Sequence, residues 1–299
     1  MAARYVVTGL NGQVVSALVE RAGIRAGVEI LPIGRPDLDL ANMDSIEKAL
    51  SAARPDVIIS AAAYTAVDQA EDDEAAAFAV NAVAVGEIGK VAKKLGVPVV
   101  HLSTDYVFDG EKATPYGETD PVNPLGVYGR SKLEGERLLA TVCDDYAILR
   151  TAWVYSPIGK NFLRTMLRLA QDRDALNVVA DQYGNPTSAL DIADAVLLVG
   201  RNLLASRDAD LRGIFHMAGS GEASWADFAT EIFRVSGAEG GPVAKVAPIP
   251  SSDYPTPASR PKNSRLNCGK LASIHNVRLP DWKSSTLTVV SRLLSSRSF

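Results

Sequence analysis

The sequence has few of the features that mark secreted, membrane-bound or nucleic-acid-binding proteins. Its 299 residues include 2 cysteines, Cys143 and Cys268, which form neither a CxxC pair nor a disulfide framework. The formal net charge of −4 provides no broad basic field for nucleic acid or an anionic membrane. No run of eighteen apolar residues is uninterrupted, and residues 1–10 begin with a strand-like segment where a signal peptide would have a charged one. These absences predict a soluble, cytoplasmic protein without a nucleic-acid or membrane partner.

The signatures of several enzyme classes are also missing. No spacing of His, Cys and Asp is typical of a metal site, and neither a GxSxG motif nor a P-loop occurs. We therefore expect no bound metal, and the hydrolase and kinase classes are disfavoured. What is present is ordinary globular composition, with 47% hydrophobic and 22% charged residues, enough for one large domain or two unequal ones.

The first half of the chain alternates short β-branched segments with longer helical ones. The expected strands are residues 5–8, 29–33, 57–60, 97–102 and 147–149, and the expected helices are residues 12–22, 45–53, 71–95 and 125–139. Apolar strands that alternate with amphipathic helices predict an α/β fold, a doubly wound parallel sheet of the Rossmann type. Ligands of such sheets bind at the carboxyl ends of the strands.

The second half breaks this rhythm, because proline and glycine interrupt residues 181–188 and 248–261. We expect pocket-forming loops there, in a smaller substrate-binding lobe. A helix at residues 191–201 and a strand at 214–217 would return to the first domain. The predicted division is a dinucleotide-binding domain of residues 1–153 plus about 190–220, and a substrate-binding lobe of about 154–189 plus 221–299.

A glycine-rich turn follows the first predicted strand. It consists of Gly9, Leu10, Asn11, Gly12, Gln13 and Val14. Glycine there lets the backbone approach a pyrophosphate, whose charge is met by the N–H groups at the start of the next helix. Val15 stands where a third small residue is usual, so the first helix should lie slightly farther from the sheet. The turn predicts a dinucleotide-binding site.

A phenol and an ammonium group, at Tyr128 and Lys132, stand four positions apart on one face of a predicted helix. A predicted strand delivers Ser103, Thr104 and Asp105 to the same edge of the sheet as the glycine-rich turn. A hydroxyl, a phenol and a lysine would then surround one carbonyl group beside a nicotinamide.

In these residues the sequence resembles the extended short-chain dehydrogenase/reductase family. The resemblance gives catalytic roles to Thr104, Tyr128 and Lys132, and it places Ser103 beside the cofactor. Lys132 would lower the pKa of the Tyr128 phenol, ordinarily about 10, and bind the nicotinamide ribose. Tyr128 would give its proton to the substrate oxygen.

Longer segments resemble one branch of that family, the dTDP-4-dehydrorhamnose reductases. They are residues 61–71, 103–110, 128–136, 150–155 and 181–187, within a resemblance that spans roughly residues 5–265. It implies reduction of the 4-keto group of dTDP-4-dehydro-L-rhamnose to dTDP-L-rhamnose, a precursor of cell-surface polysaccharide. It also implies contacts with this nucleotide-sugar substrate from Thr104, Asp105, Tyr128, Trp153, Asn161, Phe162, Asn185 and Arg260.

The cofactor contacts that the resemblance implies include Tyr128, Lys132, Asp39, Leu40, Ala62, Ala63, Tyr64 and Thr65. After the strand predicted at 29–33, the chain reads Gly34-Arg35 and has no carboxylate to accept the ribose 2′-hydroxyl of NADH. An arginine at this place pairs well with a 2′-phosphate, although a solvated loop arginine is the simpler reading. We therefore predict a preference for NADPH over NADH, with Arg35 as a cofactor residue.

Some alternatives stay open at this point. His101 is a rival general acid, although its place in mid-strand favours a hydrogen-bonded structural histidine. Asp105 precedes Tyr106, whereas related dehydratases have an Asp-Glu pair, so reduction is favoured over elimination. The regulatory subunit of methionine adenosyltransferase resembles the same family, which leaves a non-catalytic role open. Reduction of a different nucleotide ketosugar is also open.

The assembly is predicted from missing acids. Some members of the reductase family dimerise through Mg²⁺ held by glutamates of both subunits. Two positions that match those glutamates carry Ala17 and Leu190, which offer no oxygen ligand, and the tail from Ser291 to Phe299 has no acid. We therefore predict a monomer or a metal-independent dimer.

Overall fold

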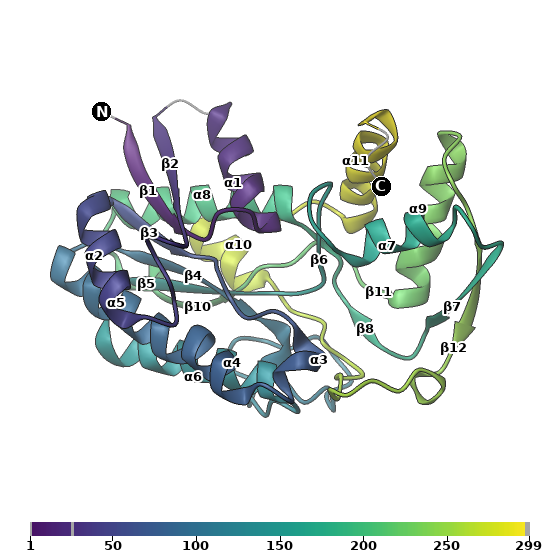
Figure 1. Ribbon diagram of the computed structural model, residues 1–299, viewed down its shortest axis with the longest axis horizontal. Coiled ribbons are helices and arrows are strands. Elements are labelled where there is room, and N and C mark those ends of the chain that lie inside the picture. Colours follow the sequence, from purple (N-terminus) through teal and green to yellow (C-terminus); the bar gives the residue numbers. More distant parts are fainter. Residues whose placement is uncertain (1, 25–26, 297–299) are drawn as a thin grey trace.

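The computed structural model describes residues 2–24 and 27–296, and in this part of the chain a six-stranded sheet forms the centre (Figure 1). Its strands are β1 (Ala3–Thr8), β2 (Val28–Ile33), β3 (Val57–Ser60), β4 (Val99–Thr104), β5 (Tyr146–Thr151) and β10 (Gly213–His216). Their order is β10-β5-β4-β3-β1-β2, and all neighbours are parallel. The predicted doubly wound parallel sheet is therefore confirmed. The chain turns in opposite directions from β1, toward β2 and toward β3, and such a switch point opens a crevice at the carboxyl ends of the strands.

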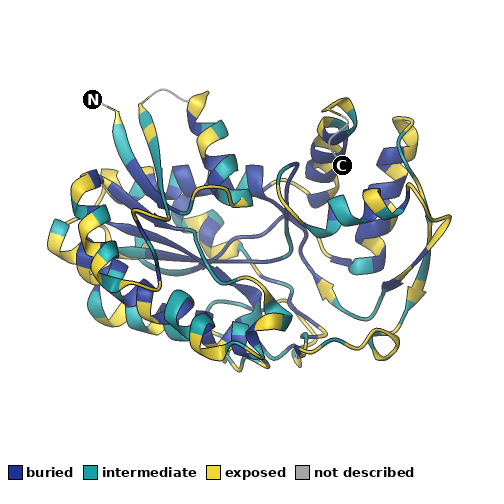
Figure 2. Cartoon of the chain, in the orientation of Figure 1, coloured by how far each residue is buried: buried dark blue, intermediate teal, exposed yellow. Residues whose placement is uncertain are grey.

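Helices cover both faces of the sheet. α1 (Gln13–Gly23) and α8 (Ala189–Ala205) pack together on one face, while α2 (Met43–Ala53), α5 (Ala84–Leu95) and α6 (Val127–Val142) cover the other. Successive strand residues alternate between these two cores, since Tyr5 and Val7 belong to one and Val6 to the other. The central strands β3, β4 and β5 are buried on both sides (Figure 2), which explains why they are continuous apolar runs in the sequence. The edge strand β2 is only partly buried.

The helix predicted for residues 71–95 runs from Glu74 to Leu95 in the structure and contains a π-helical turn. α3 (Val67–Ala70) and α4 (Glu74–Phe78) come first, and a π-helical turn, Ala79–Val83, then leads into α5. By length and composition alone the stretch Glu74–Leu95 is suited to cross a membrane, which the search for uninterrupted apolar runs did not detect. More than half of its apolar window is buried inside the protein, where α5 packs between α2 and α6. It is therefore a core helix of this fold.

The second half of the chain adds a smaller group of elements, at the right of Figure 1. Its helices are α7 (Phe162–Leu169), α9 (Trp225–Ala238) and α11 (Trp282–Ser296). The short strands pair as β7 (Ala175–Val179) with β12 (Lys245–Ile249), β8 (Tyr183–Gly184) with β11 (Ala223–Ser224), and β6 (Val154–Tyr155) with β9 (Thr187–Ser188). Proline-rich residues 248–261 form no α-helix, as predicted. We propose the lobe division given above, with one feature to note: α10 (Gly269–His275) packs against β10 and α8 of the sheet.

Candidate active site

A cavity of about 670 Å³ lies where β1 and β3 end, at the switch point of the sheet. Its walls come from three loops and one residue of the π-helical turn: Gly9, Leu10, Asn11, Gly34, Arg35, Leu38, Asp39, Leu40, Ala41, Ala62, Ala63, Tyr64 and Val80. Gly9 has φ +101, which favours glycine, and its N–H donates to the carbonyl oxygen of Ile33 at 2.7 Å. The first turn is thereby fastened to the end of β2, and its backbone faces the cavity.

Most residues that were predicted to contact the cofactor line this cavity. The others do not: Gly12, Gln13, Val14, Thr65, Ser103, Tyr128 and Lys132. Gly12 caps α1 with extended backbone. The side chain of Gln13 is turned toward the second lobe, where its Oε1 accepts from Ser156 Oγ and from Asn161 Nδ2, each at 3.0 Å. Gln13 therefore joins the two halves of the protein, a role that its place in the glycine-rich turn did not indicate.

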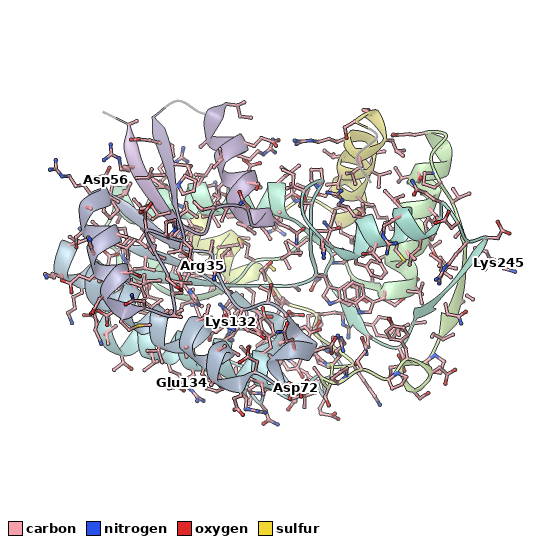
Figure 3. The ribbon with its side chains drawn as sticks, viewed as in Figure 1. Arg35, Asp56, Asp72, Lys132, Glu134 and Lys245 are labelled. Carbon is pink, nitrogen blue, oxygen red and sulfur yellow. The ribbon has the colours of Figure 1, made fainter. Side chains whose placement is uncertain are left out.

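Arg35 is the cation at the cavity wall. Its guanidinium has no ion pair or hydrogen bond within residues 2–24 and 27–296. Arg35 is exposed, and Figure 3 shows it away from the outline of the view, where Asp56 and Lys245 lie. An unpaired guanidinium beside a cavity is suited to bind a phosphate group. The neighbouring acid is committed elsewhere, because Asp39 Oδ1 accepts from the N–H of Ala41 at 3.0 Å.

Thr104 and Tyr128 come together at the carboxyl end of β4. The Thr104 hydroxyl donates to Asp105 Oδ1 at 3.0 Å and accepts from the N–H of Tyr106 at 3.2 Å. Burial raises the pKa of Tyr128 to about 12, and a hydrogen bond with Thr104 partly offsets this effect. Burial also raises the pKa of Asp105 to about 6. The sheet edge thus holds a protonated phenol next to a buried hydroxyl and a buried carboxyl group.

The prediction that Lys132 lowers the pKa of Tyr128 is wrong for this structure. Lys132 Nζ donates to the carbonyl oxygen of Leu102 at 2.7 Å and lies 3.3 Å from His101 Nε2, so its charge is held at β4. Lys132 is not among the groups that shift the pKa of Tyr128. Burial instead lowers the pKa of Lys132 itself to about 8, and Glu136 opposes this change.

His101 is fully buried and hydrogen-bonded, which agrees with the structural reading of this residue. Its Nδ1 lies 3.0 Å from Ser60 Oγ on β3. Burial, and then the charge of Lys132, hold the pKa of His101 well below its ordinary value. A neutral, enclosed imidazole that faces Lys132 is poorly placed to act as the general acid.

Two further polar groups support the site and were missed from the sequence. Asn81, in the π-helical turn, bonds the backbone of Tyr64 through both amide atoms and donates to Ser131 Oγ on α6 at 3.0 Å. A lone asparagine in an Ala- and Val-rich helix was the available signal. Glu136 pairs with Arg150 through two bonds of 2.9 and 2.6 Å. It stands four positions after Lys132, on the same helix face.

Glu136 also accepts from the Ser103 hydroxyl at 2.5 Å. Ser103 was predicted to contact the cofactor, and the structure instead uses its side chain to bind this buried carboxylate. The pair of Glu136 and Arg150, only 2% and 3% exposed at their side chains, fastens α6 to β4 and β5. Breaking one partner of such a buried pair leaves an uncompensated charge, so the pair holds the helix that carries Tyr128 and Lys132.

Trp153 lies just after β5 with φ +44, an uncommon conformation for a bulky residue. Its indole stacks on that of Trp225, with ring centroids 3.5 Å apart and an interplanar angle of 5°, and Phe162 packs against the other tryptophan at 4.7 Å. A Cβ at Gly184 would stand 2.5 Å from the Trp153 ring, so glycine is required there. Trp153 and Phe162, both predicted to contact substrate, form part of one aromatic cluster.

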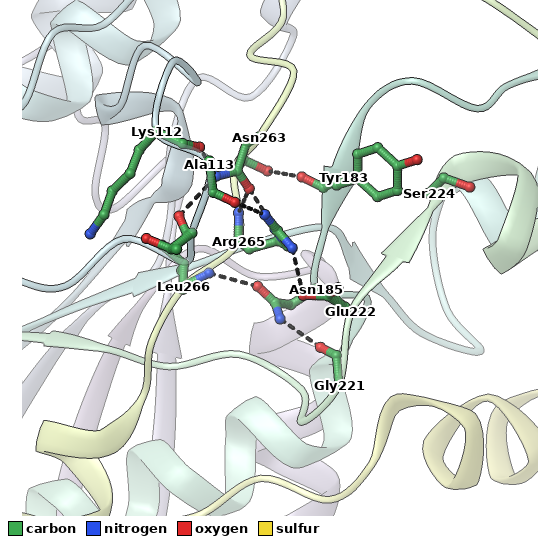
Figure 4. A network of polar contacts seen from close by, with 12 residues as sticks. Lys112, Ala113, Tyr183, Asn185, Gly221, Glu222, Ser224, Asn263, Arg265 and Leu266 are labelled. Carbon is green, nitrogen blue, oxygen red and sulfur yellow. Dashed lines mark hydrogen bonds and ion pairs between the residues drawn. The ribbon is translucent and has the colours of Figure 1, made fainter.

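The polar residues predicted to bind substrate make contacts within the protein. Asn161 Oδ1 caps α7 by accepting from the N–H of Arg164 at 3.1 Å. Asn185 joins two loops, since its amide donates to Gly221 O at 2.6 Å and accepts from Leu266 N at 2.8 Å (Figure 4). The guanidinium of the third residue, Arg260, is bound in a bidentate manner by Asp68 of α3, at 3.1 and 2.8 Å.

Comparison with known proteins places this site in a family. Residues 3–295 match the family described as RmlD substrate binding domain. The dTDP-4-dehydrorhamnose reductase of Sinorhizobium fredii is 54% identical over 97% of this chain and 98% of its own length. The crystal structure of the Bacillus anthracis dTDP-4-dehydrorhamnose reductase in complex with NADP has a TM-score of 0.89 and 31% identity over 98% of this chain and 100% of that one.

A further relative, from Streptomyces antibioticus, is named a probable dTDP-4,6-dihydroxy-2-methyloxan-3-one 4-ketoreductase. It is 38% identical over 94% of this chain and 92% of its own length. The match over nearly the whole chain agrees with the geometry at the sheet edge. The chain therefore belongs to the RmlD substrate binding domain family, that of the dTDP-4-dehydrorhamnose reductases.

Proposed function

We propose that this protein is an NADPH-dependent reductase of the 4-keto group of dTDP-4-dehydro-L-rhamnose, with dTDP-L-rhamnose as the product. The proposal rests on one observation: Thr104 and Tyr128 lie together at the sheet edge that also holds the cavity. The chain is also 54% identical to a dTDP-4-dehydrorhamnose reductase. The family relationship suggests the substrate, and the residues present suggest the reaction.

The cavity fits a dinucleotide phosphate. Leu10 and Asn11, which precede the N-terminus of α1, would hold the pyrophosphate with backbone N–H groups. Gly9, whose own N–H is bonded to Ile33 O, would let the backbone come close to the phosphates. Arg35, which has no partner in the described part of the chain, would pair with the 2′-phosphate. Ala62, Ala63 and Tyr64 would form the opposite wall. The nicotinamide cofactor supplies the hydride when it is bound.

The protein's own residues supply the proton and position the groups that react. A pKa of about 12 keeps the Tyr128 phenol protonated at neutral pH, and this is the form that a reduction needs, because the carbonyl oxygen gains negative charge. Thr104, beside the phenol, would keep the phenol in position. Lys132 would bind the nicotinamide ribose. Thr104 and Asp105 are buried, so the edge of the site beside the phenol is closed to water.

The test is NADPH oxidation followed by absorbance, with the ketosugar generated in situ from dTDP-glucose by the dehydratase and the epimerase. We expect turnover and a product that co-elutes with dTDP-L-rhamnose. Bound NADPH without turnover of this or any other dTDP-ketosugar would refute the proposal and favour a non-catalytic subunit. A pull-down of a synthetase partner would then be the next experiment.

A second candidate is reduction of another dTDP-ketosugar, which the Streptomyces antibioticus relative favours. Comparing kcat/KM for the two ketosugars, supplied together and separately, shows which of the two reactions the enzyme prefers. The proposal includes action as a monomer or metal-independent dimer in the cytoplasm, without a nucleic-acid or membrane partner. Both cysteines are free thiols, which suits a reducing compartment.

A further inference from the structure

A buried polar chain runs behind Lys132, from α6 through β4 to β3. Lys132 Nζ lies 3.3 Å from His101 Nε2, and His101 Nδ1 lies 3.0 Å from Ser60 Oγ. The three residues are 2%, 0% and 1% exposed. The proposed reaction assigns no role to His101 or Ser60. Enclosed polar side chains of this kind are costly to bury unless each finds its partners, so the chain needs an explanation.

Counting donors and acceptors decides how the chain is arranged. An ammonium group has three N–H donors, and the Leu102 carbonyl accepts one of them at 2.7 Å. His101 accepts a second one at Nε2 only if its own proton is on Nδ1, and Ser60 Oγ is the acceptor that fixes the proton there. Burial and the charge of Lys132 keep the pKa of His101 far below its ordinary value, so the imidazole stays neutral. One N–H of Lys132 is left over.

We propose that His101 is a positioning residue for Lys132: its Nε2 and the Leu102 carbonyl together hold the ammonium so that the remaining N–H is presented to the ribose of the nicotinamide cofactor. This inference rests on the proposed function. The chain also reaches the cofactor cavity, because Ser60 ends β3 directly before the segment that carries Ala62 and Ala63. Loss of His101 should therefore be felt in cofactor binding as well as in turnover.

Two substitutions of His101 separate positioning from packing. In His101→Gln the side-chain amide reaches the place of Nε2 and restores an acceptor for Lys132. In His101→Asn the shorter amide reaches only the place of Nδ1, beside Ser60. We expect His101→Asn to weaken NADPH binding roughly 10- to 100-fold, the range for a lost hydrogen bond to a charged group, and His101→Gln to stay within about threefold of wild type.

A double-mutant cycle with Lys132→Met tests whether His101 acts through the lysine. If it does, His101→Asn adds little to the loss of NADPH affinity that Lys132→Met causes alone. A packing role for His101 predicts the same additional loss in both backgrounds. Unfolding temperatures of all variants show whether stability or positioning has changed.

His275 offers a matched control, because it is another buried histidine, 2% exposed and packed edge-on against Phe215 at 4.6 Å. It lies on α10, which packs against the outer strand β10. His275→Asn should lower the unfolding temperature and leave the Kd of NADPH unchanged. This comparison removes the general cost of replacing a buried imidazole.

The Kd of NADPH is measured by its fluorescence without any ketosugar, so the two proposals fail separately. Wild-type protein that binds NADPH but reduces no ketosugar refutes the proposed function alone. Equal Kd values for His101→Asn and His101→Gln overturn the inference. So does an equal loss of NADPH affinity when His101→Asn is introduced into the wild type and into Lys132→Met. If His101→Asn does not fold, Ser60→Ala replaces it: removal of the acceptor for Nδ1 should weaken NADPH binding, and an unchanged Kd overturns the inference.

Discussion

The cofactor cavity and the second lobe hold their predicted ligand-binding residues in different states. At the cavity, Arg35 has no partner among the described residues and Leu10 is 46% exposed. In the second lobe, Asn161 caps a helix and Asn185 bridges two loops. Arg260, also predicted to contact substrate, is already paired with Asp68. The cavity thus has a polar side chain available to a ligand, whereas the corresponding side chains of the second lobe are bonded within the protein.

This difference shows how a polar side chain near a motif should be judged. A donor is available to a ligand only when the protein has not already used it, and Asn185 has both amide atoms engaged with backbone. Removing such a residue costs stability before it costs affinity. Arg35 and Arg260 are therefore the informative pair, since one guanidinium is unpaired in the described chain and the other has an exchangeable carboxylate partner.

The largest expected effect is at the centre of the site, between the two regions. Tyr128→Phe keeps the ring that packs edge-on against Tyr106 at 5.6 Å but removes the acidic proton. We expect kcat to fall by about 100-fold or more, the usual contribution of general acid catalysis, with the Kd of NADPH unchanged. Lys132→Ala should damage both quantities. Wild-type turnover in Tyr128→Phe would contradict the mechanism.

The next effect tests whether Arg260 belongs to the wall or to the substrate site. If it binds the diphosphate, Arg260→Ala should raise the KM for the ketosugar about tenfold to a hundredfold, as expected for lost charge-assisted bonds. Asp68→Asn is the matched control, because it breaks the same ion pair and leaves the guanidinium in place. Equal changes in KM for the two variants would show that Arg260 serves only to hold α3 against the proline-rich segment.

A smaller effect is expected at the open cavity. Arg35→Ala should raise the KM for NADPH by roughly tenfold and leave that for NADH unchanged, because only NADPH has a 2′-phosphate for the guanidinium. Steady-state kinetics with both cofactors measure this ratio. A wild-type preference for NADH that the substitution does not alter would remove Arg35 from the cofactor site.

The last prediction is that removal of Mg²⁺ has no effect on assembly or activity. Ala17 and Leu190 are 2% and 6% exposed and lie in one core between α1 and α8, so they offer neither an oxygen ligand nor a free surface for Mg²⁺. EDTA should leave both the sedimentation coefficient and the activity unchanged. A dimer that dissociates in EDTA and returns with Mg²⁺ would prove this prediction wrong.

Much of the sheet was predictable because its signals are local. Apolar runs marked the strands, and β4 lies two residues later than predicted, at 99–104 where 97–102 was expected, so that it includes Ser103 and Thr104. The interruption of regular α-helix within residues 74–95 was not predictable from periodicity. Its π-helical turn brings the backbone of Asn81 so close to α6 that a Cβ at Gly135 would lie 2.0 Å from Asn81 O, a contact between helices that no local pattern contains.

By itself the sequence determined which residue types stand at the ends of the strands, because a glycine with positive φ and a Tyr and Lys one helical turn apart are local requirements. Only the tertiary structure decided which of their atoms are engaged. Lys132 reaches across 30 positions to Leu102, and Arg260 reaches across 192 positions to Asp68. Such pairs form because packing brings elements together and burial forces every donor to find an acceptor, and neither condition appears in a short stretch of chain.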